Sequence, residues 1–257
     1  MTMKNSKSIS IAMSNQKGGV AKTASTAAIA SVLANMGYSV LLIDLDGQGN
    51  LSHTFLSSTP RETVADMLND GTLPIVHIRD GLDIITCDSN ISTVAQAMCE
   101  PDDRLILKKR LKKISGQYDF ILMDCPPAYN YITVNAYSAA DYIFIPSDTC
   151  DDCMEGIALM ADACLTAAPQ KTPTGIFFTL YDPRPKINRI IEQAIRNKYP
   201  SLVLKTTIRR SCKVKEARNK RTDIVSYDPT SNPALDYVAL VHEILEIINA
   251  NNNETDR

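Results

Sequence analysis

Seven short apolar runs along the chain constrain its fold more than any other feature. Each run is rich in Ile, Val, Leu and Phe, and none shows the strict polar alternation of a strand with one wet face. The runs are SISIAMS (8–14), SVLLIDLD (39–46), LDIITC (82–87), DFILMD (119–124), DYIFIPS (141–147), TGIFFTLY (174–181) and LVLKTTI (202–208). Strands buried on both faces are typical of parallel sheets covered by helices, so we expect a mostly parallel β-sheet.

Amphipathic or alanine-rich stretches separate these runs and fit crossover helices. They cover residues 22–36, 102–115, 151–168, 186–198 and 233–249. This order predicts an α/β fold with a doubly wound, mostly parallel β-sheet flanked by helices, and ligands at the carboxyl ends of the strands. Since no linker, repeat or low-complexity block divides the chain, we expect a single domain over residues 1–257, with flexible ends at 1–7 and 250–257.

The composition disfavours disulfide-stabilised, redox and membrane-spanning proteins. Seven cysteines, an odd number scattered through the chain, favour reduced thiols. Cys150 and Cys153 form one close pair, but the aspartates between them would raise the thiol pKa values, and His53, His77 and His242 stand alone. No run approaches the roughly 18 apolar residues of a membrane span, and the first ten residues lack an apolar signal segment. We expect a soluble, cytoplasmic protein.

The charge is unevenly distributed along the chain. The net charge is only −2, but residues 171–221 contain fourteen basic and three acidic residues. That segment therefore carries +11 and leaves −13 for the rest of the chain. Such a separation points to a polyanionic partner, although basic surface is more often merely solvated.

Residues 15–25, NQKGGVAKTAS, join the first apolar run to the first helical stretch. Backbone N–H groups and the helix dipole at such a junction can hold a polyphosphate. Gly18 and Gly19 would let the backbone approach the phosphates, Lys22 would reach the β/γ oxygens, and the Thr23 hydroxyl would complete a Mg²⁺ shell. The alternative is a glycine-containing turn with a solvated lysine. The candidate phosphate-binding residues are Gly18, Gly19, Val20, Ala21, Lys22, Thr23 and Ala24.

An additional lysine, Lys17, stands on the loop itself and gives the pattern K-G-G-x-x-K-T. This pattern resembles the deviant Walker A loop of the ParA/MinD group of P-loop ATPases. The resemblance implies ATP as cofactor and an ATP-bound homodimer in which Lys17 reaches the nucleotide of the other subunit. Ala21 replaces the usual glycine, which is acceptable at negative φ. Ala24 replaces a common threonine and would remove a hydroxyl contact to the α-phosphate, weakening nucleotide affinity.

Two further segments support the resemblance. LLIDLDGQGNLSHTF resembles the D-x-D-P-Q-G-N segment of this group, with Gly47 in place of Pro, and YDFILMDCPPAYN resembles the Walker B segment. The resemblance implies that Thr23, Asp44 and Asp124 hold Mg²⁺ and that Asp46 orients the attacking water. Lys17, Lys22 and Asp46 are the candidate catalytic residues, because positioning and charge stabilisation are most of what phosphoryl transfer requires.

The C-terminal third is similar to the ParA/Soj-type DNA partition branch of this group. That similarity implies an ATP-gated dimer that binds double-stranded DNA without sequence preference, and a ParB-like centromere-binding protein that stimulates hydrolysis. It further implies a nucleoid-associated protein that partitions plasmid or chromosomal DNA. Arg209 stands where a proline near the adenine is common. The candidate DNA-binding residues are Arg189, Arg210, Lys213, Lys215, Arg218, Lys220 and Arg221.

Two alternative functions remain open at this point. A MinD-like cell-division ATPase would need a basic amphipathic C-terminal helix, whereas Asp236, Glu243 and Glu246 make this helix acidic on its polar side, so we expect no membrane binding. Another deviant-Walker P-loop enzyme, such as the nitrogenase iron-protein type, would need interfacial thiolates that Cys125 and Cys150 do not clearly match.

Overall fold

The computed structural model describes residues 7–150, 153–167 and 171–255. In these residues eight strands form a sheet with the order β3-β4-β2-β5-β1-β6-β7-β8. Neighbouring strands are parallel except β3 and β4, which are antiparallel. The strands are β1 (Ile9–Met13), β2 (Val40–Asp44), β3 (Ile75–Arg79), β4 (Leu82–Ile85), β5 (Phe120–Asp124), β6 (Tyr142–Ser147), β7 (Gly175–Tyr181) and β8 (Val203–Arg209). The predicted doubly wound α/β fold is confirmed.

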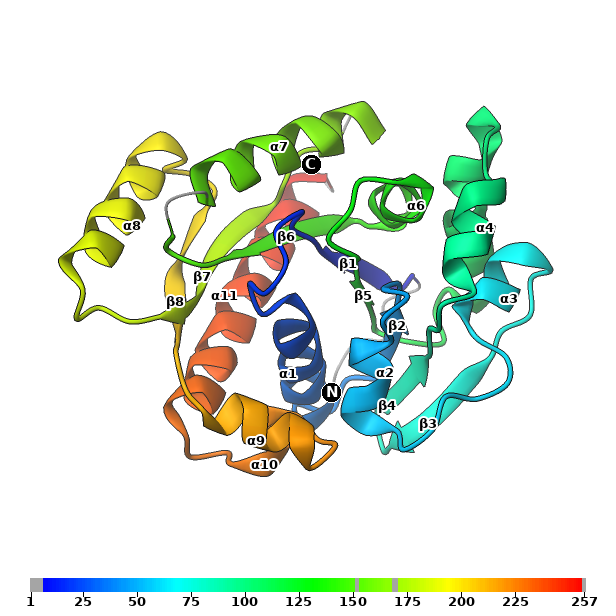
Figure 1. Ribbon diagram of the computed structural model, residues 1–257, viewed down its shortest axis with the longest axis horizontal. Helices are drawn as coiled ribbons and strands as arrows, with labels where there is room; N and C mark the ends of the chain where they lie inside the picture. The colour runs from blue at the N-terminus through cyan, green and yellow to red at the C-terminus, as the bar shows by residue number, and fades with distance from the viewer. Residues whose placement is uncertain (1–6, 151–152, 168–170, 256–257) are drawn as a thin grey trace.

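Helices cover both faces of the sheet, with α6 and α7 on one side and α1 and α11 on the other (Figure 1). The α-helices are α1 (Lys22–Asn35), α2 (Asn50–Phe55), α3 (Val64–Asn69), α4 (Ile91–Ala97), α5 (Ile106–Leu111), α6 (Tyr131–Ala139), α7 (Cys153–Ala167), α8 (Lys186–Lys198), α9 (Lys213–Asn219), α10 (Ile224–Tyr227) and α11 (Asn232–Thr255). Two 3₁₀ turns, η1 (Pro101–Leu105) and η2 (Lys112–Ile114), flank α5.

Strand residues alternate between two hydrophobic cores, as the absence of polar alternation predicted. On β2, Val40 and Leu42 pack with the residues of α1 and α11, while Leu41 and Ile43 pack with those of α3 to α7. All five residues of β2 are buried. Burial on both faces fixes the register of each central strand, because a shift by one residue would exchange the two faces.

The structure corrects the sequence prediction at the sheet edge and in one helix. β3 was not predicted, because an edge strand that includes His77 and Arg79 and is only partly buried lacks the continuous apolar run of the central strands. The single helix expected over 102–115 is instead η1, α5 and η2. Of the helix expected over 151–168, α7 covers 153–167, and residues 151, 152 and 168 lie outside the described residues.

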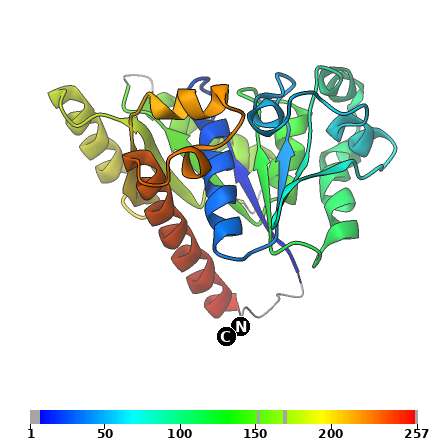
Figure 2. The same cartoon turned by 90° about the horizontal axis from the view of Figure 1, so that it is seen from below.

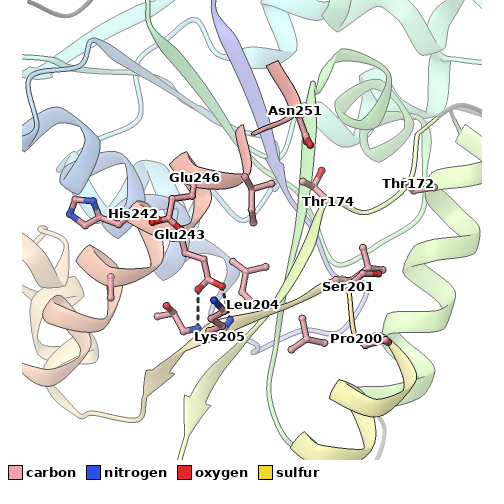
Figure 3. Close-up of a pocket in the computed structure, with 15 residues that line it drawn as sticks. Thr172, Thr174, Pro200, Ser201, Leu204, Lys205, His242, Glu243, Glu246 and Asn251 are labelled. Atoms are coloured by element: carbon pink, nitrogen blue, oxygen red, sulfur yellow. Dashed lines mark hydrogen bonds between the residues drawn. The ribbon is translucent and has the colours of Figure 1, made fainter. Parts of the chain in front are cut away.

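The last helix, α11, is longer than predicted and uses its acidic residues differently. It continues beyond residue 249 to Thr255, so the flexible end expected at 250–257 is helical as far as that residue. Glu243 accepts hydrogen bonds from the backbone N–H groups of Lys205 (2.7 Å) and Thr206 (3.0 Å), beside a pocket of about 850 Å³ (Figure 3). Asp236 accepts one from Arg209 N (2.9 Å).

Asp236 and Glu243 therefore face the edge strand β8, whereas Glu246 is exposed. They occupy N–H groups that an edge strand would otherwise offer to another chain. The outer edge of the sheet is thus closed by α11.

Candidate functional site

The predicted phosphate loop lies at the carboxyl edge of the sheet, between β1 and α1 (Figure 2). Gly19 has a positive φ of 79°. A Cβ placed on Gly18 or Gly19 would meet no atom within 4 Å, so the space beside this backbone is open to a ligand. The start of α1 directs its free N–H groups to the same edge, which suits a bound polyphosphate.

Polar side chains from distant strands anchor this loop. Asn15 is buried and donates from Nδ2 to Pro146 O on β6 (2.9 Å), and its Oδ1 accepts from Lys17 N (2.9 Å). Thr179 on β7 donates to Val20 O (2.9 Å). Because β6 and β7 are both buried strands, these bonds hold the loop on a rigid support.

Ala21 adopts a left-handed conformation, with φ 58° and ψ 29°. The acceptability of alanine rested on a negative φ, and that expectation is wrong. A non-glycine residue in this region is strained by roughly 1–2 kcal/mol. The loop therefore holds residue 21 in a backbone conformation that glycine adopts readily, although the residue is alanine.

Lys22 is the most buried lysine of the site, with 7% of its surface exposed. Its Nζ donates to Lys17 O (2.9 Å). Burial lowers the pKa of Lys22, and the nearby charge of Asp124 opposes that shift. The Lys22 ammonium is thus desolvated and fixed beside the loop. Because little water competes for it there, it can form a strong charge-assisted hydrogen bond to a phosphate.

Asp44 and Asp124 end the neighbouring strands β2 and β5 and lie directly opposite each other. Ser52 holds Asp44 Oδ2 through its backbone N–H (2.8 Å) and hydroxyl (2.7 Å). Burial raises the pKa of Asp44 to about 6. Burial, and then the charge of Asp44, raise the pKa of Asp124 to about 8.

The carboxylate pair fits a divalent cation. Asp124 Oδ2 is buried and has no hydrogen-bond partner, while Oδ1 accepts from Thr26 Oγ1 (3.4 Å) and the Thr23 side chain lowers the Asp124 pKa. Oxygen ligands of this kind suit Mg²⁺, and a cation would offset the repulsion between the two acids. In the described part of the chain no three His, Cys, Asp or Glu residues gather to hold a metal, so the remaining ligands would be phosphate, water and the Thr23 hydroxyl.

Asp46 lies in the turn after β2 and is half-buried. Its backbone N–H donates to Asp44 Oδ1 (3.1 Å), and its own Oδ1 accepts from Gln48 N (3.0 Å). The turn thus joins the predicted water-orienting residue to a predicted metal ligand. Asp46 is also close enough to Lys22 and Asp124 to affect the pKa values of both.

Lys17 contacts two residues that follow β6. Its Nζ lies 3.4 Å from Asp148 Oδ1 and contacts the Cys150 thiol, which itself donates to Asp148 Oδ1 (3.1 Å). The Lys17 and Asp148 side chains are 30% and 24% exposed. The second lysine of the loop is therefore held at the rim, apart from the buried position of Lys22.

Comparison with known proteins places the chain in a family. Residues 8–171 match the AAA domain family. The chromosome-partitioning ATPase Soj of Treponema pallidum is 32% identical over 240 residues, covering 90% of this chain and 94% of that protein. The chromosome partitioning protein ParA of Caulobacter vibrioides is 31% identical, covering 91% and 93%. The chain belongs to the Soj/ParA family of P-loop ATPases. As a member of that family it is an ATPase, and its loop and paired carboxylates suit ATP and Mg²⁺.

Solved structures share the fold. Cobyrinic acid a,c-diamide synthase of Mycobacterium smegmatis, with bound ADP and magnesium, gives a TM-score of 0.82 at 24% identity and covers 95% of this chain and 96% of its own. A McdA–ATP complex from Cyanothece gives 0.83 at 20% identity and covers 94% and 98%. The Soj/ParA family thus shares its architecture with proteins of different names. No helix of the described residues is long and apolar enough to cross a membrane.

All seven predicted DNA-binding cations are exposed, but three of them make intramolecular contacts. Lys213 forms an ion pair with Asp228, Arg218 donates to Asn50 Oδ1 (2.6 Å) and Arg221 donates to Leu56 O (2.6 Å). Within the described chain Arg189, Arg210, Lys215 and Lys220 have neither an ion pair nor a side-chain hydrogen bond.

The same cations come from different elements. Lys213, Lys215 and Arg218 share α9. Arg189 lies on α8, which Figure 1 shows well apart from α9. Arg209, which replaces the common proline, pairs with Asp236 (2.6 Å). Several cations of the basic region are therefore bound within the protein, and fewer remain to bind an external ligand.

Several site residues were missed by the sequence analysis. Thr26, Ser52 and Thr179 hold Asp124, Asp44 and the loop, and Asp148 holds Lys17. Two of them lie in or beside a motif of the sequence: Thr26 stands one turn beyond Thr23 on α1, and Ser52 falls within the segment LLIDLDGQGNLSHTF.

Proposed function

We propose that this ATPase dimerises on Mg-ATP, binds DNA without sequence preference and partitions plasmid or chromosomal DNA. Support comes chiefly from the two lysines of the phosphate loop. Lys22 is buried between the loop and the carboxylates, whereas Lys17 stands at the rim, where it can leave Asp148 for a nucleotide bound to a second copy. A loop that bound nucleotide only within one chain would need one such lysine.

Hydrolysis follows from the arrangement of the charges. Mg²⁺, when bound by Thr23, Asp44 and Asp124, neutralises charge on the phosphates. Lys22 and Lys17 stabilise the charge that develops on the transferred phosphoryl group, and Asp46 orients the water. These roles need positioning and electrostatics rather than a covalent intermediate.

DNA binding is assigned to the cations without intramolecular partners, chiefly Arg210, Lys215 and Lys220. Between Arg189 and Arg221 the single aromatic residue is Tyr199, so base stacking has little to act through, and phosphate contact is the available mechanism. A dimer presents two such surfaces, and because contact free energies add, dimerisation raises DNA affinity steeply. Nucleotide state would thereby control DNA binding.

The partner and location extend the same proposal. The relatives are named for chromosome partitioning. A ParB-like centromere-binding protein would stimulate hydrolysis and release the dimer from DNA. We accordingly place the ATPase in the cytoplasm, on the nucleoid.

The test is a salt titration of duplex binding with ATP, with ADP and without nucleotide. The informative variant is Arg210→Glu with Lys215→Glu; Lys213 is avoided because its substitution would also break the pair with Asp228. We expect tight binding with ATP alone, a slope of log K against log salt of about −4 to −8, and a flatter slope in the variant on every sequence.

A control with the same change in net charge is Arg61→Glu with Asn69→Asp and Gln96→Glu, three exposed residues outside the basic region. It should keep the wild-type slope. Equal affinity in all three nucleotide states, or strong preference for one duplex sequence, would reject the proposed gating. Binding to anionic vesicles in place of DNA would favour the MinD-like alternative.

A further inference from the structure

A second basic segment of the chain lies outside residues 171–221. Residues 108–113 read KKRLKK, so five of six residues are basic. No acidic residue occurs between Arg104 and Asp119. Such a density of one sign is uncommon in a chain whose net charge is −2.

The structure separates this segment into an apolar and a charged side. Leu107, Leu111 and Ile114 are buried in the core beneath α5 and η2. Lys108, Lys109, Lys112 and Lys113 are all exposed. Arg110 is half-buried beside Gly71, so it belongs to the protein interior rather than to the lysine surface. We call the four exposed lysines the α5 lysine surface.

The α5 lysine surface has no internal counterions among the described residues. None of its four ammonium groups has an ion pair or hydrogen bond to the protein. By contrast, Arg196, Arg209 and Lys213 of the 171–221 region pair with Glu192, Asp236 and Asp228. An uncompensated cluster of like charges is unfavourable in the free protein and favours an external polyanion.

Lys171 adds to this concentration of positive charge. Its Nζ donates to Ala140 O, and its pKa is lowered by burial, opposed by Asp141, and further lowered by Lys108 and Lys7. The one nearby carboxylate, Asp141, is already paired with Lys7 (2.8 Å). The positive charge at Lys108 therefore acts on Lys171, which belongs to another segment of the chain.

The α5 lysine surface lies at the amino edge of the sheet, opposite the phosphate loop. η2 precedes the start of β5, Lys7 precedes β1, and Lys171 precedes β7. In parallel strands these starts share one edge, and Figure 2 shows the start of β1 and the end of α11 there, away from α2 and α9. The surface is thus separate from the nucleotide site and from α9.

We propose that Lys108, Lys109, Lys112 and Lys113 form a second DNA-binding surface that contacts the phosphate backbone independently of nucleotide. DNA fits better than a membrane, because α5 and η2 expose no large apolar side chain that could enter a bilayer. None of these four lysines lies over an aromatic ring of the described residues, and ammonium point charges recognise phosphates and not bases. The inference shares with the proposed function only the choice of DNA as the polyanion.

This surface gives the protein a weak hold on DNA in every nucleotide state. Each neutralised phosphate contributes about −0.9 to the slope of log K against log salt, so four lysines contribute at most about −3.6. A monomer released after hydrolysis would then stay near DNA, and a dimer could touch a second duplex through its opposite edges.

The test uses the full chain without nucleotide and a variant in which Lys108, Lys109, Lys112 and Lys113 are all replaced by glutamine. Anisotropy of labelled duplexes of several sequences is followed against salt. We expect the slope to flatten by about 3 and the affinity at low salt to fall at least about tenfold. The additional affinity gained with ATP should remain. A circular dichroism melt establishes that the variant is folded, and Lys108→Gln with Lys109→Gln gives half the change if the quadruple variant is not.

Separate outcomes distinguish this inference from the proposed function. The Arg210→Glu, Lys215→Glu variant should keep binding without nucleotide and lose the ATP-dependent gain. Unchanged slopes in the glutamine variant, or no measurable binding by the wild type without nucleotide, overturn the α5 lysine surface. Lysine-dependent binding to phosphatidylglycerol vesicles, without lysine-dependent binding to duplex, overturns it in favour of a membrane.

Discussion

Replacing Ala21 by glycine should stabilise this protein, although glycine inside a helix usually destabilises it. Ala21 is the N-cap of α1, where φ is 58° and no side chain caps the helix. The backbone at this position is left-handed, a conformation that costs a residue with a Cβ roughly 1–2 kcal/mol. Glycine adopts it without that cost.

The expected gain is smaller than the strain, because glycine also makes the unfolded chain more flexible. That effect opposes the gain by about 0.4–1 kcal/mol. The net stabilisation is therefore about 0.5–1 kcal/mol, which for a chain of this size raises Tm by about 1–4 °C. Mg-ATP should bind at least as tightly, since the loop no longer has to hold a strained residue.

Ala24→Gly is the matched control, because the same substitution three residues later falls inside α1. There glycine has no left-handed conformation to relieve and should cost about 0.5–1 kcal/mol. Urea and thermal unfolding, each with and without Mg-ATP, measure both variants. A loss of stability in Ala21→Gly equal to that in Ala24→Gly would falsify the assignment of strain to Ala21.

Three further predictions concern the charges of the site. Lys22→Ala should lower ATP affinity at least about 100-fold in calorimetry, because a charge-assisted hydrogen bond contributes about 1.5–3 kcal/mol and Lys22 would make more than one; undiminished affinity would contradict the loop assignment. Lys17→Ala should bind ATP but stay monomeric, whereas Asp46→Ala should accumulate as an ATP-bound dimer, and light scattering that finds both monomeric would contradict the role of Asp46. Asp148→Asn should release Lys17 and strengthen ATP-driven dimerisation by about two- to fivefold for each lysine released, since a partly exposed ion pair contributes at most about 1 kcal/mol. Asp162→Asn on the outer face of α7 is the control, and equal dimerisation of the two variants would exclude a restraining role for Asp148.

The central part of the fold could be predicted because a strand that is buried on both faces consists of consecutive apolar residues. Strands such as β2 and β5 are buried along their whole length, so every residue must be apolar until the carboxylate at the end. β3 pairs with one strand and its residues are only partly buried, so its sequence lacks such a continuous apolar run. The break of 102–115 into three short elements depends on packing against α6, which no local pattern reports.

The candidate site could be predicted where its residues end a buried strand or begin the helix that follows one. Asp44 and Asp124 end β2 and β5, and Lys22 and Thr23 begin α1 after β1, so topology alone gathers them at one edge. Thr179 reaches the loop across 159 positions and Asp148 reaches Lys17 across 131, and such pairings follow only from the three-dimensional arrangement. The φ of Ala21 could not be predicted either, because a single alanine carries no information about the sign of its own φ.

The net charge of a segment, counted from the sequence, does not identify a binding surface. Residues 171–221 carry the largest excess of basic residues, yet Arg209 and Lys213 pair with acids that follow this segment, Asp236 and Asp228. The α5 lysine surface has a smaller total but keeps all its charges unpaired, because the amino edge of the sheet offers few carboxylates and Lys7 already pairs with Asp141. What attracts a polyanion is the charge left after internal pairing, since a neutralised cation releases no counterions from DNA. On that criterion the two edges of the sheet are comparable, which is why DNA contact is proposed at both.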